Sequence, residues 1–317
     1  MKVIDIINKS DSTLFSFELL PPLKGNNASN IYNTIENLLD LNPQYINITT
    51  HRDEVVYSES PNGEIKKQVV RKRPGAVAIA ASIQHRYGIP VVPHILCGGF
   101  TKSETEHVLM DLNFLGIENV LALRGDGVKS DVVFRAEEDG HTNANELVKQ
   151  IKNLGKGKYL DPDLKNTAAL DFCVGVAGYP EKHFEAPNFN TDLNYLKQKV
   201  DTGAEYIVTQ MFFDNKVYFD FVDKCRAADI NVPIIPGIKS ISTLRQLTVL
   251  PKIFSLDLPD DLVNELLRCK TDADAKLVGT EWTIQQAKEL VAAKVSSLHM
   301  YTMGVSDSTK NIIKAVF

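Results

Sequence analysis

The sequence predicts an α/β protein, a single (β/α)8 TIM barrel with extra helices that spans residues 1–317 as one domain. Three observations lead to this prediction. Short runs rich in β-branched and aromatic residues alternate with helical patterns from end to end, which is typical of parallel βαβ units. Eight such runs are present, and eight parallel strands suit a closed barrel. No Gly/Ser-rich linker or shift in composition divides the chain.

The elements follow one another in a regular order. The predicted strands cover 14–18, 45–49, 91–95, 120–123, 172–176, 206–210, 234–237 and 297–301. The predicted helices cover 29–41, 76–87, 104–115, 144–154, 192–202, 216–228, 243–254 and 282–293, with extra helices at 260–269 and after residue 307. Long connections at 51–74, 125–142 and 176–191 all follow strands. They should therefore lie on the C-terminal face of the barrel, where barrel enzymes build their sites.

Composition and charge disfavour several classes of protein. The net charge of −5 provides no global basic field for nucleic acid or an anionic membrane. The chain carries no signal-peptide pattern and no apolar run long enough to span a bilayer. Its four cysteines lie far apart without a CxxC pair, which predicts no metal site, no disulfide framework and a cytoplasmic location. A local basic run at 66–73 favours a solvated loop or helix face, with phosphate binding as the weaker alternative.

Polar residues stand at the ends of five predicted strands. Strand one ends in Glu18, strand two in Thr49 and strand six in Gln210, while strand three carries His94 and strand four runs into the segment 124–126, Arg-Gly-Asp. The C-terminal ends of barrel strands converge at one mouth. The sequence therefore predicts an active site there.

Glu18 is the most informative of these residues. It lies in the segment FSFELLPP, and a carboxylate among apolar neighbours should have a raised pKa unless a cation pairs with it. A raised carboxyl pKa suits a general acid at neutral pH. The alternative is a structural salt bridge from Glu18 to a barrel arginine such as Arg124.

Seven segments resemble those of the methylenetetrahydrofolate reductase family, in the same order and spacing. They are FSFELLPP, INITTH, VPHILC, GIENVLALRGD, AGYPEKH, DLNYLKQKVDTGAEYIVTQMFFD and PIIPGI, and they extend from Ser16 to about Tyr301. The resemblance implies a flavoprotein barrel with FAD as cofactor and NADH or NADPH as co-substrate. It implies reduction of 5,10-methylenetetrahydrofolate to 5-methyltetrahydrofolate, within one-carbon metabolism and methionine synthesis, and self-association of the barrel into a homo-oligomer.

The resemblance also implies residue roles. Glu18 resembles the family's general acid, which assists protonation at N10 as the imidazolidine ring opens. Asp126 resembles the catalytic aspartate beside the flavin and the folate, where a fixed negative charge tunes both half-reactions. Gln210 and Gln246 resemble glutamines that contact the folate, and Thr49 resembles a nicotinamide contact. The positions that match FAD contacts are Thr50, His94, Arg124, Gly125, Asp126, Ala144, Tyr179, His183, Ala186, Asp192 and Lys199.

The chain departs from the family pattern at a few positions. Tyr195 and Leu250 replace a small polar FAD contact and an aromatic residue that packs on the nicotinamide. After the last strand, the segment 301–305 lacks an arginine that contacts the folate tail. Two alternatives remain open: a relative that receives its electrons from another protein, and a flavin- or folate-binding module without catalysis. The combination of Glu18, Asp126 and Gln210 argues against the second.

Overall fold

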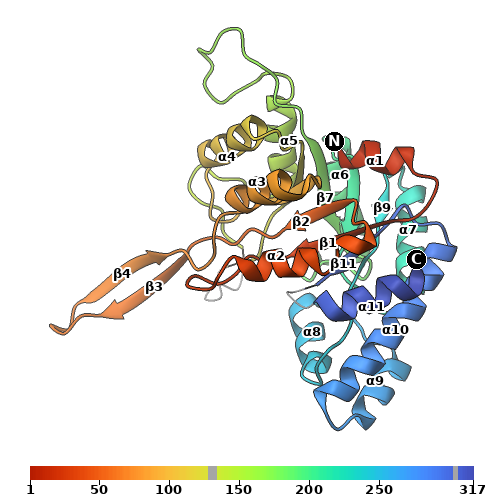
Figure 1. Ribbon diagram of the computed structural model, residues 1–317. Helices are drawn as coiled ribbons and strands as arrows, with labels where there is room; N and C mark the ends of the chain where they lie inside the picture. The colour runs from red at the N-terminus through yellow and green to blue at the C-terminus, as the bar shows by residue number, and fades with distance from the viewer. Residues whose placement is uncertain (128–133, 303–305) are drawn as a thin grey trace.

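The computed structural model describes residues 1–127, 134–302 and 306–317, and parallel strands form a barrel at its centre (Figure 1). The strands are β1 (Leu14–Leu19), β2 (Tyr45–Ile48), β5 (Val91–Leu96), β6 (Asn119–Leu123), β7 (Cys173–Gly178), β8 (Tyr206–Thr209), β9 (Ile234–Ile235), β10 (Gly237–Ile238) and β11 (Ser297–Tyr301). Their order in the sheet is β10-β11-β1-β2-β5-β6-β7-β8-β9. Pro236 separates β9 from β10, so the two short strands together occupy the seventh barrel position. The fold class predicted from the sequence is confirmed.

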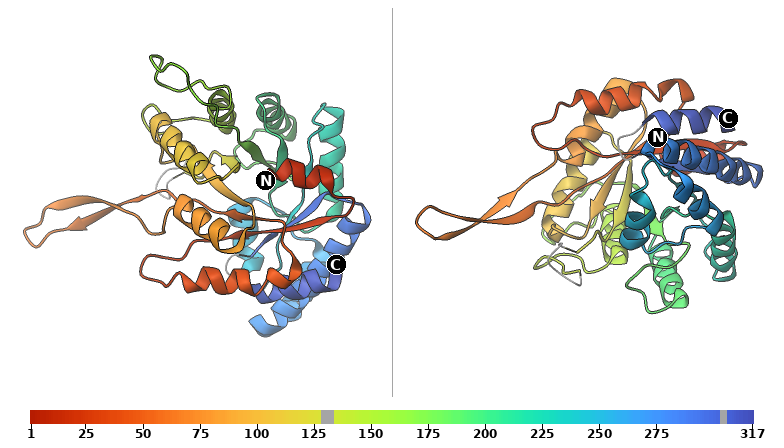
Figure 2. Two further views of the ribbon diagram at one scale, coloured as in Figure 1. Left: turned by 45° about the horizontal axis from the view of Figure 1, so that its top comes forward. Right: turned by 90° about the horizontal axis from the view of Figure 1, so that it is seen from below.

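Helices surround the sheet, as the further views in Figure 2 show. They are α2 (Ser29–Glu36), α3 (Ala76–Tyr87), α4 (Lys102–Phe114), α5 (Ala144–Leu154), α6 (Phe189–Asp201), α7 (Asn215–Ala227), α8 (Gln246–Phe254), α9 (Asp260–Arg268), α10 (Asp272–Ala292) and α11 (Ser306–Val316), with a 3-10 turn at Leu39–Leu41. Two helices begin three or more residues earlier than predicted, α6 and α10. Asn188 caps α6 by accepting from Thr191 N, and Thr271 forms a capping box with Asp274 at the start of α10. These caps, not the apolar pattern, set the helix starts.

A short helix that the sequence prediction missed, α1 (Val3–Lys9), closes the N-terminal end of the barrel. Val3, Ile6 and Ile7 are buried in one apolar cluster with interior residues such as Tyr45 and Tyr206. The Val3 amide donates to the Asn119 side chain at 2.7 Å, which fixes the start of this helix to β6. A ligand can therefore approach the barrel interior from the C-terminal end.

Side chains inside the barrel change from apolar to polar toward that open end. The apolar layer includes Leu14, Tyr45, Val92, Leu121, Tyr206 and Ile235. Two residues further along their strands stand Ser16, Asn47 and His94, all buried. Because side chains alternate along a strand, these residues point into the barrel as well. The interior thus has an apolar base beneath a polar layer.

The sequence prediction placed no strand in the long connection 51–74, and this was wrong. It contains an antiparallel hairpin of β3 (Glu54–Glu59) and β4 (Ile65–Val70) that projects from the body of the molecule (Figures 1 and 2). The turn at its tip holds Asn62-Gly63, a sequence that favours tight hairpins, with Gly63 at φ +82°. The β-branched and aromatic residues of EVVYSE and IKKQVV are the signal that could have revealed these strands.

The basic run at 66–73 is therefore not a helix face: residues 66–70 belong to β4, and residues 71–73 form the connection that follows it. The charged side chains of its second half already have partners at the base of the hairpin. Arg71 pairs with Asp53 at 3.1 Å, Lys72 pairs with Glu54, and Arg73 donates to the carbonyl of Pro21. This arrangement does not favour the phosphate-binding alternative. None of the helices in the described ranges is long and apolar enough to cross a membrane.

Candidate active site

Glu18 lies at the mouth of the barrel, near the end of β1, with 17% of its side chain exposed. In the strand register it stands beside Asn47 on one side and Tyr301 on the other. Its Oε2 is 3.6 Å from His94 Nε2, and its backbone carbonyl accepts from Thr302 Oγ1 at 2.6 Å. Of the polar strand ends in the prediction, His94 therefore lies beside this carboxyl group.

Burial keeps both members of the Glu18–His94 pair neutral at physiological pH. It raises the pKa of Glu18 from 4.5 to about 8 and lowers the pKa of His94 to about 3. A separation of 3.6 Å is also too long for a hydrogen bond. The pair is therefore not a salt bridge, and Glu18 holds a proton that it can transfer.

The alternative of a salt bridge from Glu18 to Arg124 is wrong. The Arg124 guanidinium instead makes a bidentate ion pair with Glu185, with Nη1 2.5 Å from Oε2 and Nη2 2.8 Å from Oε1. That pairing lowers the pKa of the Glu185 carboxyl. The arginine thus has its own carboxylate, and no lysine or arginine among the described residues pairs with Glu18.

Beneath Glu18 lies a polar floor made by side chains of neighbouring strands. His299 Nδ1 and Ser16 Oγ are 3.0 Å apart, and burial lowers the pKa of His299 to about 3. Asn47 is completely buried, and neither atom of its amide has a hydrogen-bond partner among the residues that the structure describes. Buried amides of this kind are usually satisfied by water or a ligand. The floor therefore offers polar groups to whatever binds above it.

Lys239 is a mouth residue that the sequence prediction missed. It follows β10 and points to the same side as Gly237, where a Cβ would meet the Tyr301 ring at 2.5 Å. Only 5% of Lys239 is exposed, and burial lowers its pKa to about 8. Within the described ranges no carboxylate forms an ion pair with its ammonium. Alternation along strand seven would have revealed it, but that strand was predicted to stop at Gly237.

A charged wall follows the ends of β6 and β7. Arg124 stacks over the Phe134 ring at 4.8 Å, and Tyr179 meets the His183 ring edge to face at 4.7 Å. Burial raises the pKa of Tyr179, and the negative charge of nearby Asp126 adds to the effect. The wall therefore brings together arginine, aromatic and acidic groups that the sequence had placed in separate segments.

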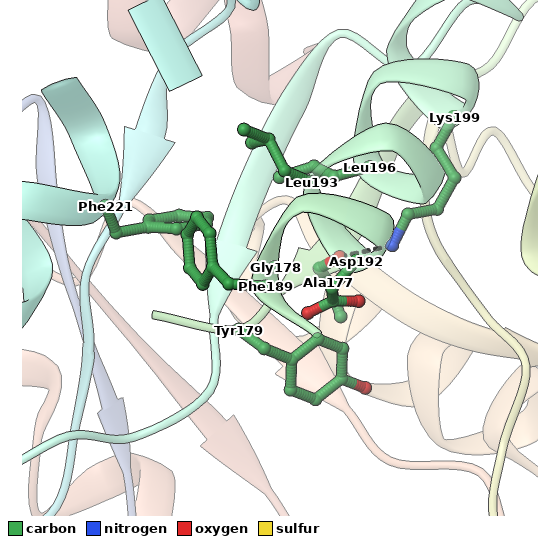
Figure 3. A pocket seen from close by; sticks show the side chains of 9 residues that line it. All are labelled: Ala177, Gly178, Tyr179, Phe189, Asp192, Leu193, Leu196, Lys199 and Phe221. Carbon is green, nitrogen blue, oxygen red and sulfur yellow. Dashed lines mark hydrogen bonds between the residues drawn. The ribbon is translucent and has the colours of Figure 1, made fainter. Parts of the chain in front are cut away.

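Lys199 and Asp192 extend this wall from α6, as Figure 3 shows. Lys199 Nζ donates to the carbonyl of Ala177 at 2.6 Å, and Asp192 accepts from the amide of His183 at 2.8 Å. Burial lowers the pKa of Lys199 to about 8, although Asp192 opposes the shift. The cavity between these residues measures only about 10 Å³, so it admits no more than a water molecule. Any larger ligand must lie over the open mouth.

The other predicted site residues occupy the rim. Thr50 donates to the carbonyl of His94 at 2.5 Å, and Thr49 donates to that of Leu19 at 3.3 Å. Gln210 directly follows β8, where its side chain accepts from the amide of Met211. Gln246 accepts from the amide of Ser242 at 2.7 Å, which fixes the turn before α8. Sequence alone did not show that the side-chain carbonyls of both glutamines accept hydrogen bonds from nearby backbone amides.

Three further positions complete the predicted set. Gly125 has a φ of +82°, Ala186 is buried, and Ala144 is the first residue of α5. Tyr195, the departure on α6, is 52% exposed. Residues 303–305, where the family's arginine is lacking, lie outside the described residues, as do residues 128–133 of the connection after β6.

Comparison with known proteins agrees with the resemblance seen in the sequence. The family model for methylenetetrahydrofolate reductase matches residues 2–316. Methylenetetrahydrofolate reductase (NADH) 1 of Arabidopsis thaliana is 31% identical over an alignment of 326 positions, which covers 99% of this chain and 50% of that protein. The 5,10-methylenetetrahydrofolate reductase of Salmonella typhimurium is 30% identical over 292 residues, 91% of this chain and 85% of that protein. The chain thus spans about half the length of the plant relative.

A solved structure shares the fold. An uncharacterized Clostridium thermocellum protein, described as binding two copies of 5-methyl-5,6,7,8-tetrahydrofolic acid, superposes with a TM-score of 0.57. The two chains are 14% identical, and the match covers 98% of this chain and 97% of the other. At this identity the likeness supports the barrel architecture alone.

Replacement of Lys239 by methionine should stabilise the protein. Burial favours the neutral amine of Lys239. The charged ammonium therefore lowers the stability of the folded protein at pH values below the unfolded pKa of 10.5. At pH 7 the Lys239→Met variant should gain up to about 3 kcal/mol, at about 1.4 kcal/mol per unit of pKa difference. The advantage should shrink as pH rises from 8 toward 10.5, because the wild-type lysine then loses its proton in both states. Urea unfolding across this range measures it, and an equal or lower stability of the variant at pH 7 contradicts the assignment.

Proposed function

Because this chain belongs to the methylenetetrahydrofolate reductase family, we propose that it reduces 5,10-methylenetetrahydrofolate to 5-methyltetrahydrofolate, with FAD as its cofactor and NADH or NADPH as hydride donor. The observation that carries the proposal is the neutral Glu18 carboxyl at the barrel mouth, with a pKa of about 8 and no lysine or arginine partner among the described residues. A carboxylic acid that stays protonated at neutral pH is the group that general acid catalysis requires.

The charged wall fits a flavin dinucleotide in its chemistry. Arg124 and Lys199 supply positive charge for a pyrophosphate, Tyr179 supplies an aromatic face, and Gly125 permits close approach of the backbone. The Nε2 atom of His94, buried without a hydrogen-bond partner among the described residues, provides a further polar contact. Bound FAD would supply the ring that accepts hydride from the nicotinamide and passes it to the folate.

Glu18 and Asp126 would divide the remaining chemistry between them. Glu18 would donate its proton to N10 of the folate as the imidazolidine ring opens, and nearby Tyr301 and His94 would keep it in an environment that favours the acid form. Asp126, at the end of β6, would place a fixed negative charge beside the cationic folate and so stabilise the charge that develops there. Glu18 would thus act as the proton donor and Asp126 as a fixed negative charge.

The rim residues would bind the two substrates. Gln210 and Gln246 still have their amide nitrogens to donate, because their carbonyl oxygens accept from the backbone in the structure. We assign both to the folate and Thr49 to the nicotinamide. Lys239, in the same mouth, adds a cation that can meet an acidic group of a ligand. Either nicotinamide is compatible with these contacts.

The first test concerns FAD and Lys199. The purified protein should be yellow with non-covalent FAD, and Lys199→Met should raise the FAD dissociation constant about 10- to 150-fold through loss of one charge-assisted contact. Fluorescence titration of each apoprotein with FAD measures the two dissociation constants. Lys197→Met is the matched control, since Lys197 lies on the same helix but pairs with Asp201. Selective retention of FMN, or unchanged FAD affinity in Lys199→Met, contradicts the assignment.

The second test separates the two half-reactions. Glu18→Gln keeps the shape of the side chain but removes its transferable proton. Anaerobic stopped-flow traces should show flavin reduction by NADH or NADPH within a few-fold of wild type, and folate reduction slower by about 10²–10⁴-fold.

Glu181→Gln is the control for this experiment, because Glu181 also has a raised pKa, about 7, yet its carboxylate accepts from the amide of Asp257. Both half-reactions should survive in that variant. Equal slowing of the two steps in Glu18→Gln would make Glu18 structural. If neither nicotinamide reduces the wild-type flavin, a protein electron donor replaces them.

A further inference from the structure

The β3–β4 hairpin has one apolar and one polar face. The ladder pairs Val55 with Val69, Tyr57 with Lys67 and Glu59 with Ile65, so these six side chains share one face. Val55, Tyr57, Ile65 and Val69 are 43%, 68%, 75% and 67% exposed. The other face carries mainly polar residues, among them Ser58, Lys66 and Gln68. Large apolar side chains thus gather on one side of an arm that stands clear of the barrel (Figure 2).

An arm of this construction lacks a core of its own. Two strands form the whole of its sheet, and a two-stranded ribbon is only marginally stable in water. Ion pairs and hydrogen bonds fix its base to the body, through Arg71 to Asp53 and through the amide of Lys24 to the carbonyl of Lys72. Its apolar face, by contrast, stays largely exposed along its length. Burial of that face against a second surface would stabilise the ribbon.

The pattern on the apolar face suits a second copy of the same chain. A two-fold interface places one patch against itself, so the patch must be self-complementary. Beside its apolar residues this face carries one acid, Glu59 near the tip, and one base, Lys67 in the middle, with no net charge. In an antiparallel pairing each tip reaches toward the partner's base, and each strand faces its own counterpart, so Tyr57 lies opposite Tyr57 of the second copy. A partner that binds through its charge would require a face on which all charged residues have the same sign.

The area of the apolar face limits how tightly two copies can associate through it. Its four apolar side chains together expose on the order of 400 Å², so two copies would bury about 800 Å². That area lies at the weak end of specific interfaces, which predicts a reversible dimer in the micromolar range.

We propose that the β3–β4 hairpin is a dimerisation arm, whose apolar face packs against the same face of a second copy related by a two-fold axis. The proposal does not depend on the enzymatic function. It assigns a surface to the self-association that the family resemblance had implied.

Sedimentation velocity over a concentration series tests it. Wild type should pass from monomer to dimer, and the double variant Ile65→Glu with Val69→Glu should weaken dimerisation at least tenfold by placing like charges at the two-fold interface. The matched control is Ser58→Glu with Gln68→Glu, which adds the same charge to the opposite face and should dimerise as wild type does. Far-ultraviolet circular dichroism and thermal melting report that all three proteins are folded.

Cross-linking gives a gain of signal that does not rely on disruption. Under oxidation the Tyr57→Cys variant should form a disulfide between the introduced thiols of two copies, identified by mass spectrometry of the linked peptides, while Ser58→Cys should not. A wild type that stays monomeric at about 100 μM, well above the expected range, overturns the proposal. So does an oligomer that the double variant at positions 65 and 69 leaves unchanged.

Discussion

The burial of an acid without a partner cation is the constraint on which this site depends. Among the described residues no lysine or arginine forms an ion pair with Glu18: its neighbour His94 is held uncharged by burial, and Arg124 is paired with Glu185. A cation paired with Glu18 would lower its pKa and remove the proton that the proposed chemistry uses. Glu185 therefore matters because it fixes the arginine of the charged wall in a pair of its own.

The barrel compensates for this costly mouth at its other end. Tyr45 and Tyr206 fill the interior near the N-terminal face, and α1 covers them. Gly175 leaves the space for Tyr206, because a Cβ at that position would lie 2.4 Å from the ring. A tightly packed base thus supports a layer of polar groups above it, including an amide of Asn47 that lacks a partner among the described residues. Stability and function are separated along the barrel axis.

Sequence patterns predicted what depends on local chemistry. The position of Glu18 at a strand end among apolar residues sufficed for a raised pKa, and the structure confirms it. The pairing of Arg124 with Glu185 could not be predicted, because it joins residues 61 positions apart through tertiary structure. Lys239 was missed because Pro236 obscured where strand seven ends. The hairpin was missed because its few β-branched residues lie within a charged segment whose composition suggests a loop.

The protonation state of Glu18 is the central claim, and infrared difference spectroscopy tests it most directly. At pH 7, wild type minus Glu18→Gln should show the carbonyl band of a protonated carboxylic acid. That band should give way to carboxylate bands as the pH rises through about 8. A carboxylate signal already present at pH 6 would contradict the account, because Glu18 would then be an ordinary ionised side chain without a proton to donate.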